Sequence, residues 1–178
     1  KNKPKNLIAV TGTNGKSSIA DFYFQLLNLS NKKVASIGTL GIRTKNNLKN
    51  VSNTTLDPIG LSKILNDLKK QRIDNVILEA SSHGLKQNRL DGLKFNTAIF
   101  TNLSHDHLDY HKTFNDYLKS KFYLFESLLK SRGNIITDSK IPEYKNLKKI
   151  SLNNKFNLQV LSKSNNGIDI YSHQFKDD

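Results

Sequence analysis

The segment VTGTNGKSS at residues 10–18 restricts the fold of this 178-residue chain more than any other segment. It follows an apolar run at residues 7–10 and precedes residues with helical spacing. The standard phosphate-binding loop has the pattern G-x-x-x-x-G-K-[ST], and here Val10 occupies the position of its first glycine. The strand, the glycine-rich loop and the helix nevertheless follow one another in the order that phosphate binding requires.

This loop contains the residue types that a nucleotide needs. Gly12 and Gly15 can adopt positive φ, and the backbone N–H groups before the helix supply partial positive charge. Lys16 would reach the β- and γ-phosphates, and the Ser17 hydroxyl would coordinate Mg²⁺. The alternative is an ordinary turn in which Ser17 or Ser18 caps the helix. The apolar strand directly before the loop favours phosphate binding.

The remaining sequence predicts an α/β fold, with a P-loop-type, mainly parallel sheet flanked by helices. NLQVLS and GIDIYS, beyond Lys140, predict a small antiparallel β region near the C-terminus. We expect strands at 7–10, 34–39, 76–79, 97–101 and 133–138, a hairpin or loop at 41–51, and helices at 17–29, 61–68 and 113–129. The first helix is expected to bury an apolar face made of Ile19, Phe22, Tyr23, Leu26 and Leu27.

The composition indicates a cytoplasmic protein without a membrane or nucleic-acid partner. Cysteine is absent, and the chain has neither an apolar run of about 18 residues nor a signal-peptide pattern. The net charge of +13 comes from 24 lysines and only 4 arginines, scattered along a chain with 22 asparagines. We interpret this charge as solvated surface. Methionine is also absent, so we expect a single domain, 1–178, of a longer protein, and a monomer.

Two further segments contain candidate metal ligands. Glu79 ends an apolar strand, where P-loop proteins usually hold a metal-binding Asp, although it could also be a strand-end carboxylate in solvent. The loop NLSHDHLDYH includes His105, His107 and His111. Histidine can bind metal or act as a general acid or base, but such residues also suit a polar loop or a helix cap.

Lys121 interrupts the apolar stripe of the helix expected at 113–129. This stripe contains Phe114, Leu118 and Phe125, and Lys121 completes its spacing. A lysine on an inward face must extend to solvent, contact an anion or lose its charge. A neutral amine could take up CO₂ and form a carbamate, which could bind a metal.

Five motifs together resemble those of the Mur ligases, the ATP-dependent amide-bond-forming enzymes of peptidoglycan synthesis, and most closely their MurE type. They lie within residues 7–125, in the order found in the family. The motifs are TGTNGKSS, SNTTLDP, LEASSHGLKQNRL, FTNLSHDHLDYH and SKFYLF. The family's loop is G-T-N-G-K-[ST], so Val10 is not expected to be glycine.

The resemblance implies roles for individual residues. Lys16, Lys121 and His107 would be catalytic. Lys121 would be carbamylated and would help to hold the second of two Mg²⁺ ions. The implied ATP-binding residues are Gly12, Thr13, Asn14, Gly15, Lys16, Ser17 and Ser18. The implied metal ligands are Ser17, Glu79, His107 and Lys121. Residues implied to bind the UDP-sugar peptide are Asn53, Thr54, Thr55, Ser81, Gln87 and Arg89.

The resemblance also implies a reaction in two steps. ATP would phosphorylate the terminal carboxylate of UDP-MurNAc-L-Ala-D-Glu, and the amine of a free third amino acid would attack the acyl phosphate. Two substitutions depart from the family pattern, since Leu56 replaces a proline and His105 stands where arginine is common. The family's N-terminal UDP-binding domain and C-terminal amino-acid-binding domain are missing. We therefore expect this chain, as a central ATPase domain, to bind Mg-ATP without completing ligation.

Two other functions stay open at this point. Another ligase of the superfamily, such as a folylpolyglutamate or cyanophycin synthetase, would share the loop, although SSHGLKQNR with DHLDYH argues against it. A regulatory P-loop module would lack ligase activity and would favour guanine. The chain has no N-K-x-D motif for reading guanine.

Overall fold

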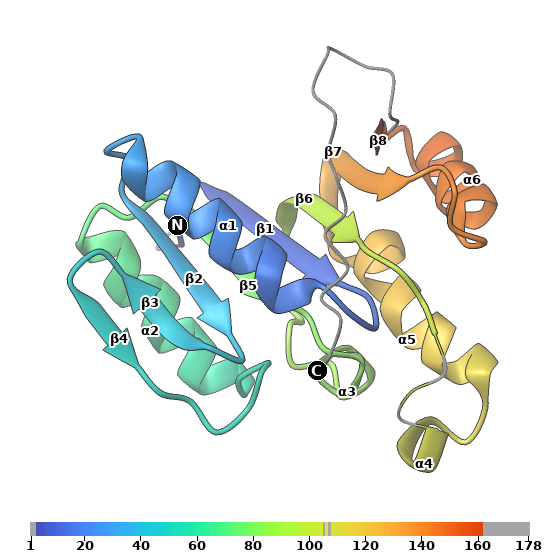
Figure 1. Ribbon diagram of the computed structural model, residues 1–178, viewed down its shortest axis with the longest axis horizontal. Coiled ribbons are helices and arrows are strands. Elements are labelled where there is room, and N and C mark those ends of the chain that lie inside the picture. Colours follow the sequence, from blue (N-terminus) through green and yellow to red (C-terminus); the bar gives the residue numbers. More distant parts are fainter. Residues whose placement is uncertain (1–2, 105, 107, 162–178) are drawn as a thin grey trace, which may run out of the picture.

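The computed structural model describes residues 3–104, 106 and 108–161; His105, His107 and the segment GIDIYS therefore lie outside the described residues. Eight strands form one sheet, and helices cover both of its faces (Figure 1). The elements in chain order are β1 (Asn6–Thr11), α1 (Lys16–Leu29), β2 (Val34–Gly38), β3 (Gly41–Thr44), β4 (Asn47–Lys49), α2 (Pro58–Lys70), β5 (Asn75–Glu79), α3 (Ser82–Lys86), β6 (Phe95–Phe100), α4 (Leu108–His111), α5 (Phe114–Ser127), β7 (Leu129–Asp138), α6 (Tyr144–Asn154) and β8 (Asn157–Leu161).

The strand order is β4-β3-β2-β5-β1-β6-β7-β8. Neighbouring strands from β2 to β8 are parallel, and β3 and β4 form an antiparallel hairpin at one edge. The predicted α/β class is confirmed, and so is the hairpin alternative for residues 41–51. Because β2, β5, β1 and β6 are parallel neighbours, their carboxyl ends lie along one edge of the sheet.

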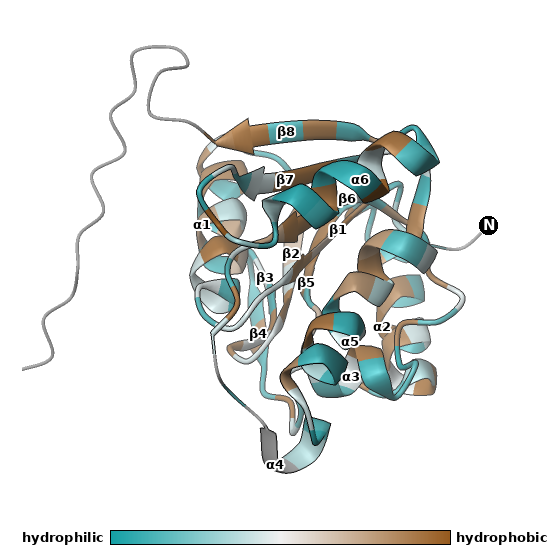
Figure 2. Ribbon diagram, turned by 90° about the vertical axis from the view of Figure 1, so that its right-hand side faces the viewer, coloured by the Kyte–Doolittle hydropathy of each residue, from teal (hydrophilic) through white to brown (hydrophobic). Residues whose placement is uncertain are grey.

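Each face of the sheet has its own apolar cluster. In β1, Leu7 and Ala9 contact the larger cluster, whereas Ile8 and Val10 contact the smaller one, as the alternation of strand side chains requires. Ala20 of α1 belongs to the smaller cluster, and α2, α3 and α5 contribute to the larger one. Figure 2 shows the sheet edge-on, with α1 on one side and α2, α3 and α5 on the other.

The predicted apolar face of α1 is partly wrong. Phe22 and Leu26 are 62% and 64% exposed, whereas Ala20 and Phe24 are buried. The Ser17 hydroxyl donates to Glu79, which fixes the rotation of the helix about its axis. At about 100° per residue, Ala20 and Phe24 then share the inward direction of Ser17, and Phe22 and Leu26 point to the opposite side.

The C-terminal part differs from the prediction in two ways. Residues Tyr144–Asn154 form α6, a helix that the sequence analysis does not predict. The antiparallel pairing expected for NLQVLS is wrong, because β8 pairs with β7 in parallel. The missed helix and the wrong strand direction have one cause. Parallel neighbours such as β7 and β8 need a crossover connection, and α6 provides it.

Helix α5 begins with a side-chain cap that sets its position. The Thr113 hydroxyl accepts a hydrogen bond from the Asp116 backbone N–H at 3.1 Å. Tyr117, Lys121 and Phe125, spaced four residues apart, are all buried. This inward face reaches the carboxyl ends of the strands. In the part of the chain that the structure describes, no helix is long and apolar enough to cross a membrane.

Candidate functional site

A polar hollow of about 290 Å³ lies where the predicted loop, β5 and α5 meet. It brings together residues for which the sequence predicts nucleotide, metal and substrate binding. Its lining residues are Thr13, Asn14, Gly15, Lys16, Ser17, Ser18, Thr39, Thr54, Glu79, Ser81, Ser82, Tyr117 and Lys121. We consider this hollow to be the candidate site.

The glycine-rich loop has a backbone that only glycine adopts without strain. Gly12 and Gly15 have φ of +148° and +84°. A Cβ on Gly12 would lie 1.8 Å from the Thr101 hydroxyl oxygen. Gly15 is the N-cap of α1, and no side chain caps this helix. Neither Ser17 nor Ser18 caps the helix, so that part of the alternative is wrong, and the first N–H groups of α1 have no intrahelical acceptors.

The segment after β6 holds the loop through hydrogen bonds that the sequence did not predict. The Thr13 N–H donates to the Asn102 carbonyl at 2.9 Å, and the Asn14 N–H donates to Asn102 Oδ1 at 3.0 Å. The Thr101 hydroxyl donates to the Asn14 carbonyl at 2.6 Å. Since Asn102 occupies two of the loop's N–H groups, a phosphate would bind the N–H groups that follow, at the start of α1.

Lys16 folds back onto its own loop. Its Nζ donates to the carbonyls of Gly12 and Thr13 at 3.0 and 2.7 Å. Burial lowers the pKa of Lys16, while the negative charges of Glu79 and Asp106 oppose that effect. The ammonium thus lies in the hollow, bound to carbonyl oxygens.

Glu79 is only 2% exposed, so the alternative of a strand-end carboxylate in solvent is wrong. Its oxygens accept hydrogen bonds from the Ser17 hydroxyl at 2.8 Å, the Thr39 N–H at 2.8 Å and the Thr39 hydroxyl at 3.2 Å. A Cβ on Gly38 would lie 2.1 Å from Glu79 Oε1, so this approach requires glycine. The sequence analysis missed both Thr39 and Gly38.

Lys121 is 1% exposed and does not extend to solvent. Its Nζ donates to the Gly12 carbonyl at 2.7 Å and lies 4.3 Å from the centroid of the Tyr117 ring. Burial and then the positive charge of Lys16 lower the pKa of Lys121 to about 7, against the attraction of Asp106. A substantial fraction of this amine is therefore neutral near pH 7.

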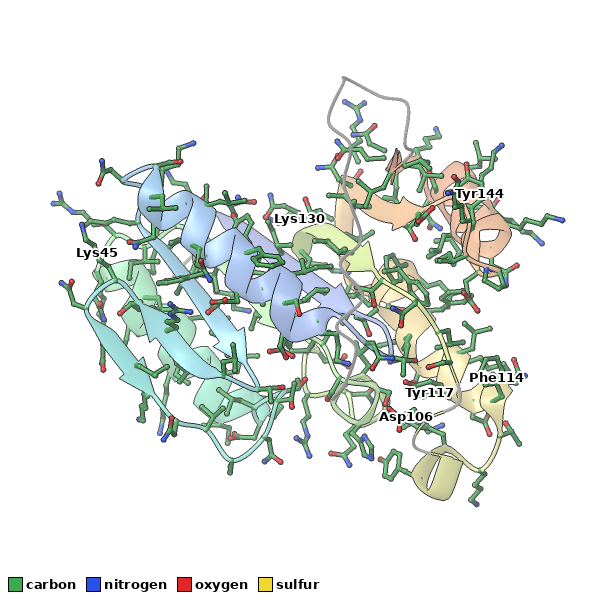
Figure 3. All side chains as sticks on the ribbon, in the orientation of Figure 1. Lys45, Asp106, Phe114, Tyr117, Lys130 and Tyr144 are labelled. Atoms are coloured by element: carbon green, nitrogen blue, oxygen red, sulfur yellow. The ribbon has the colours of Figure 1, made fainter. Side chains whose placement is uncertain are left out.

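The histidine segment is described only in part, because His107 and His105 lie outside the described residues. His111 is buried in α4, with its ring 5.2 Å from that of Tyr117 and 5.6 Å from that of His83. Figure 3 labels Tyr117 on α5 and Asp106 in the segment before α4. Burial raises the pKa of Tyr117, and the negative charge of Asp106 adds to this effect while the hydrogen bond with Thr13 opposes it, so the hydroxyl is protonated at neutral pH.

The oxygen atoms of the site fit a magnesium ion. The Glu79 carboxylate and the Ser17 hydroxyl lie 2.8 Å apart, and both are hard oxygen donors of the kind that Mg²⁺ prefers. Within residues 3–104, 106 and 108–161, no group of three or more His, Asp or Glu side chains could hold a metal. Mg²⁺ commonly uses one or two protein ligands and takes the remainder from phosphates and water.

Most of the predicted substrate residues form one network beside Glu79. The Thr55 hydroxyl donates to the Glu79 carbonyl at 2.9 Å and lies 3.0 Å from the Ser81 hydroxyl. Arg89 donates to the Thr55 carbonyl at 2.8 Å and to Gln87 Oε1 at 2.8 Å. The network therefore runs from the strand end to the surface.

Two other predicted substrate residues differ in their placement. The Thr54 hydroxyl lies 3.0 Å from the Thr39 hydroxyl, which connects it to Glu79. Asn53 is exposed, and its amide contacts the neighbouring Ser52 hydroxyl at 3.5 Å. Of the six predicted substrate residues, Thr54 and Ser81 line the hollow, whereas Asn53, Thr55, Gln87 and Arg89 do not.

A larger hollow of about 390 Å³ lies near the other end of α1. Lysine and amide side chains surround it, including Lys32, Lys33 and Asn47. None of the predicted site residues lines this second hollow. We therefore do not consider it the candidate site, although it is the larger of the two.

Comparison with known proteins identifies a family. Residues 10–178 match the family described as the Mur ligase middle domain. A relative from Rickettsia montanensis, named UDP-N-acetylmuramoyl-L-alanyl-D-glutamate--2,6-diaminopimelate ligase, is 44% identical over 171 residues, covering 89% of this chain and 36% of the relative. A relative of the same name from Wigglesworthia glossinidia brevipalpis is 47% identical, covering 69% of this chain and 25% of the relative.

Solved structures agree with this match. A structure of UDP-N-acetylmuramoyl-L-alanyl-D-glutamate--2,6-diaminopimelate ligase superposes with a TM-score of 0.80 and 36% identity, over 94% of this chain and 34% of that one. The folylpolyglutamate synthase of Mycobacterium tuberculosis has a TM-score of 0.68 at 14% identity, over 89% of this chain and 43% of that one, which shows a shared fold alone. The chain thus spans between a quarter and about a third of the length of these diaminopimelate-ligase relatives.

Proposed function

Because the chain belongs to the Mur ligase family and matches its middle domain, we propose that it is the ATP-binding domain of a MurE-type ligase. The complete enzyme would add a third amino acid to UDP-MurNAc-L-Ala-D-Glu in peptidoglycan synthesis. An N-terminal domain would bind the UDP moiety, and a C-terminal domain would bind the amino acid. The curated relatives described above are named diaminopimelate ligases, so we propose 2,6-diaminopimelate as that amino acid.

One observation carries this proposal: Lys16, Glu79 and Lys121 line the same hollow around the start of α1. A phosphate-binding loop alone is compatible with many nucleotide-binding proteins. Here the buried Glu79 carboxylate and the buried Lys121 amine also contact the loop. Phosphoryl transfer uses groups of this kind to position the substrate and to neutralise the negative charge of the phosphates.

The triphosphate of ATP would lie along the first turn of α1. The N–H groups from Gly15 to Ser18 would bind its oxygens, and Lys16 would move from the Gly12 and Thr13 carbonyls to the β- and γ-phosphates. Thr13 and Asn14 would contribute mainly by holding the loop, since Asn102 accepts hydrogen bonds from their N–H groups.

Ser17 and Glu79 would hold one Mg²⁺, and His107 together with a carbamate on Lys121 would hold a second. Bound Mg²⁺ would neutralise negative charge on the phosphate oxygens. The neutral Lys121 amine would form a nitrogen–carbon bond with CO₂ and release a proton. The product carries a carboxylate, which is a suitable magnesium ligand.

The proposed reaction activates a poor electrophile. The γ-phosphoryl group of ATP is transferred to a carboxylate oxygen of the D-Glu residue, and ADP leaves. The diaminopimelate amine then attacks the acyl carbon and forms the C–N bond, its nitrogen loses a proton to solvent, and inorganic phosphate leaves with the electrons of the broken C–O bond. Thr54, Thr55, Ser81, Gln87 and Arg89, with the exposed Asn53, would position the UDP-sugar peptide beside the γ-phosphate.

A ligation assay with the complete enzyme tests this function. UDP-MurNAc-L-Ala-D-Glu, Mg-ATP and diaminopimelate should give the tripeptide product, ADP and phosphate in equal amounts, as measured by mass spectrometry and phosphate release. Lysine in place of diaminopimelate, GTP in place of ATP, and a folate with glutamate serve as comparisons. Turnover of the folate alone would instead assign a folylpolyglutamate-type ligase, and GTP hydrolysis without ligation would assign a regulatory module.

A further inference from the structure

We propose that Tyr117 is a positioning residue that holds Lys121 and the phosphate-binding loop in a fixed relation. This inference rests on the function proposed above. Tyr117 is 1% exposed and lies one helical turn before Lys121 on α5. Its hydroxyl lies 3.1 Å from the Thr13 hydroxyl, and its ring lies 4.3 Å from Lys121 Nζ.

The hydrogen bonds around Thr13 favour one direction for the contact with Tyr117. Thr13 Oγ1 accepts from the Ser104 N–H at 2.9 Å and can donate its one proton to the Ser104 carbonyl at 3.3 Å. If Thr13 donates to Ser104, the Tyr117 hydroxyl must be the donor to Thr13. Tyr117 then completes a set of hydrogen bonds that joins the loop, the segment after β6 and α5.

The tyrosine ring limits where the lysine can lie. Lys121 Nζ donates to the Gly12 carbonyl at 2.7 Å, with the face of the Tyr117 ring beside it. The ring therefore occupies space into which the ammonium would otherwise move. The face of an aromatic ring also attracts a cation, which favours this position in the uncarbamylated lysine.

Two adjacent loop residues are therefore held by two residues of α5. Lys121 binds the Gly12 carbonyl, and Tyr117 binds the Thr13 side chain. Because Tyr117 and Lys121 are four residues apart, they lie on the same face of the helix. These two contacts join the loop to a helix whose rotation is already set by the packing of Phe122, Leu124 and Phe125, and together they fix the loop at two adjacent residues. A tyrosine that only filled the core would not need a hydroxyl contact with the loop, whereas one that positions the loop would.

The test compares Tyr117→Phe with Tyr123→Phe in the complete enzyme. Tyr123 lies on the same helix, and its hydroxyl donates to Asp91 at 2.8 Å, away from the loop, so its substitution also removes one tyrosine hydrogen bond. Tyr117→Phe should weaken binding of a non-hydrolysable ATP analogue about three- to tenfold and raise the KM for ATP equally. Tyr123→Phe should leave both values unchanged.

Two more variants separate the ring from the hydroxyl. Thr13→Val combined with Tyr117→Phe should weaken analogue binding no more than the stronger single substitution, because both remove the same hydrogen bond. Tyr117→Leu should also lower kcat about tenfold or more, because Lys121 loses the ring beside it. The carbamate signal of Lys121, followed by ¹³C NMR with labelled bicarbonate, should persist in Tyr117→Phe and decrease in Tyr117→Leu.

Particular outcomes would overturn the inference. Equal analogue affinities for Tyr117→Phe and Tyr123→Phe would assign Tyr117 a structural role only, even if its Tm were lower. Additive losses in the double variant would show that Thr13 and Tyr117 act separately. If the wild-type enzyme binds the analogue but does not ligate, the proposed function fails while the affinity comparison still decides the role of Tyr117. If the wild-type enzyme does not bind the analogue, both proposals fail.

Discussion

At the scale of single residues, the site has two buried ionisable groups whose environments differ. Glu79 is surrounded by donors from Ser17 and Thr39, which satisfy its carboxylate oxygens. Lys121 has one carbonyl acceptor and an aromatic ring, and the Lys16 ammonium lies nearby. Burial and the nearby Lys16 ammonium thus destabilise the charged form of Lys121, whereas Glu79 accepts three hydrogen bonds.

Lys121 should make the stability of the domain depend on pH. Its pKa falls from 10.5 to about 7 on folding, so between these values the unfolded chain binds a proton that the folded chain does not. The free energy of unfolding should therefore rise as pH increases from 7 to 10.5, by up to about 5 kcal/mol from this residue at 1.36 kcal/mol for each tenfold step. Urea unfolding at several pH values measures this rise.

Lys121→Met provides the comparison for that prediction. Lys121→Met should remove most of the increase in unfolding free energy between pH 7 and 10.5. Lys119 is an exposed lysine on the same helix, and Lys119→Met should retain this increase. The measurement should be made without bicarbonate, because a carbamate would replace the titrating amine. An identical pH dependence in the two variants would contradict the assignment.

Gly38 should be essential to the position of Glu79. An alanine Cβ would lie 2.1 Å from Glu79 Oε1, so Gly38→Ala must displace the carboxylate from Ser17 and Thr39. We expect a loss of about 1–3 kcal/mol in unfolding free energy and at least tenfold weaker Mg-ATP binding. Calorimetric titration measures the binding.

Gly92→Ala is the control for Gly38→Ala. Its Cβ would meet no atom within 4 Å, although its φ of +78° carries backbone strain. It should therefore lower the stability by about 1 kcal/mol and leave Mg-ATP binding unchanged. If both variants bind Mg-ATP equally well, the position of Glu79 does not depend on Gly38.

At the scale of elements, the rotation of α1 follows from the site rather than from the helix's own apolar pattern. Phe24 is 3% exposed and its ring lies 4.4 Å from the Arg43 guanidinium, whereas Phe22 is 62% exposed. Phe24→Ala should destabilise the chain by about 3–5 kcal/mol, and Phe22→Ala by no more than about 0.5 kcal/mol. Chemical denaturation compares the two. A larger loss for Phe22→Ala than for Phe24→Ala would place the helix in the rotation that its periodicity predicts.

The same elements show which features the sequence could predict. The inward position of Lys121 followed from periodicity, because α5 packs with one continuous face. The rotation of α1 did not, because it depends on the bond between Ser17 and Glu79, which are 62 residues apart. Helix α6 buries only Leu147, Ile150 and Ser151, so its apolar signal is short, and without it the direction of β8 could not be predicted.

The missed site residues have a similar explanation. Asn102 and Thr39 act on partners 88 and 40 residues away, and neither belongs to a pattern of neighbouring residues. Strand pairing brings them together, because the carboxyl ends of β2, β5, β1 and β6 share one edge of the sheet. The motifs therefore predicted the groups that would contact ligands, and the sheet order was needed to identify the residues that hold those groups.

At the scale of the whole molecule, the chain should bind Mg-ATP and fail to complete ligation. The groups proposed for the nucleotide belong to this domain, and those from Thr13 to Ser18 line the hollow together with Glu79 and Lys121. The groups proposed for the UDP-sugar peptide lie partly at the surface, and no group for the amino acid has been assigned. Calorimetry should therefore detect Mg-ATP binding that Lys16→Met weakens at least tenfold. Tripeptide formation by the 178-residue chain alone would falsify the prediction that ligation needs the other domains, because one domain would then bind all three substrates.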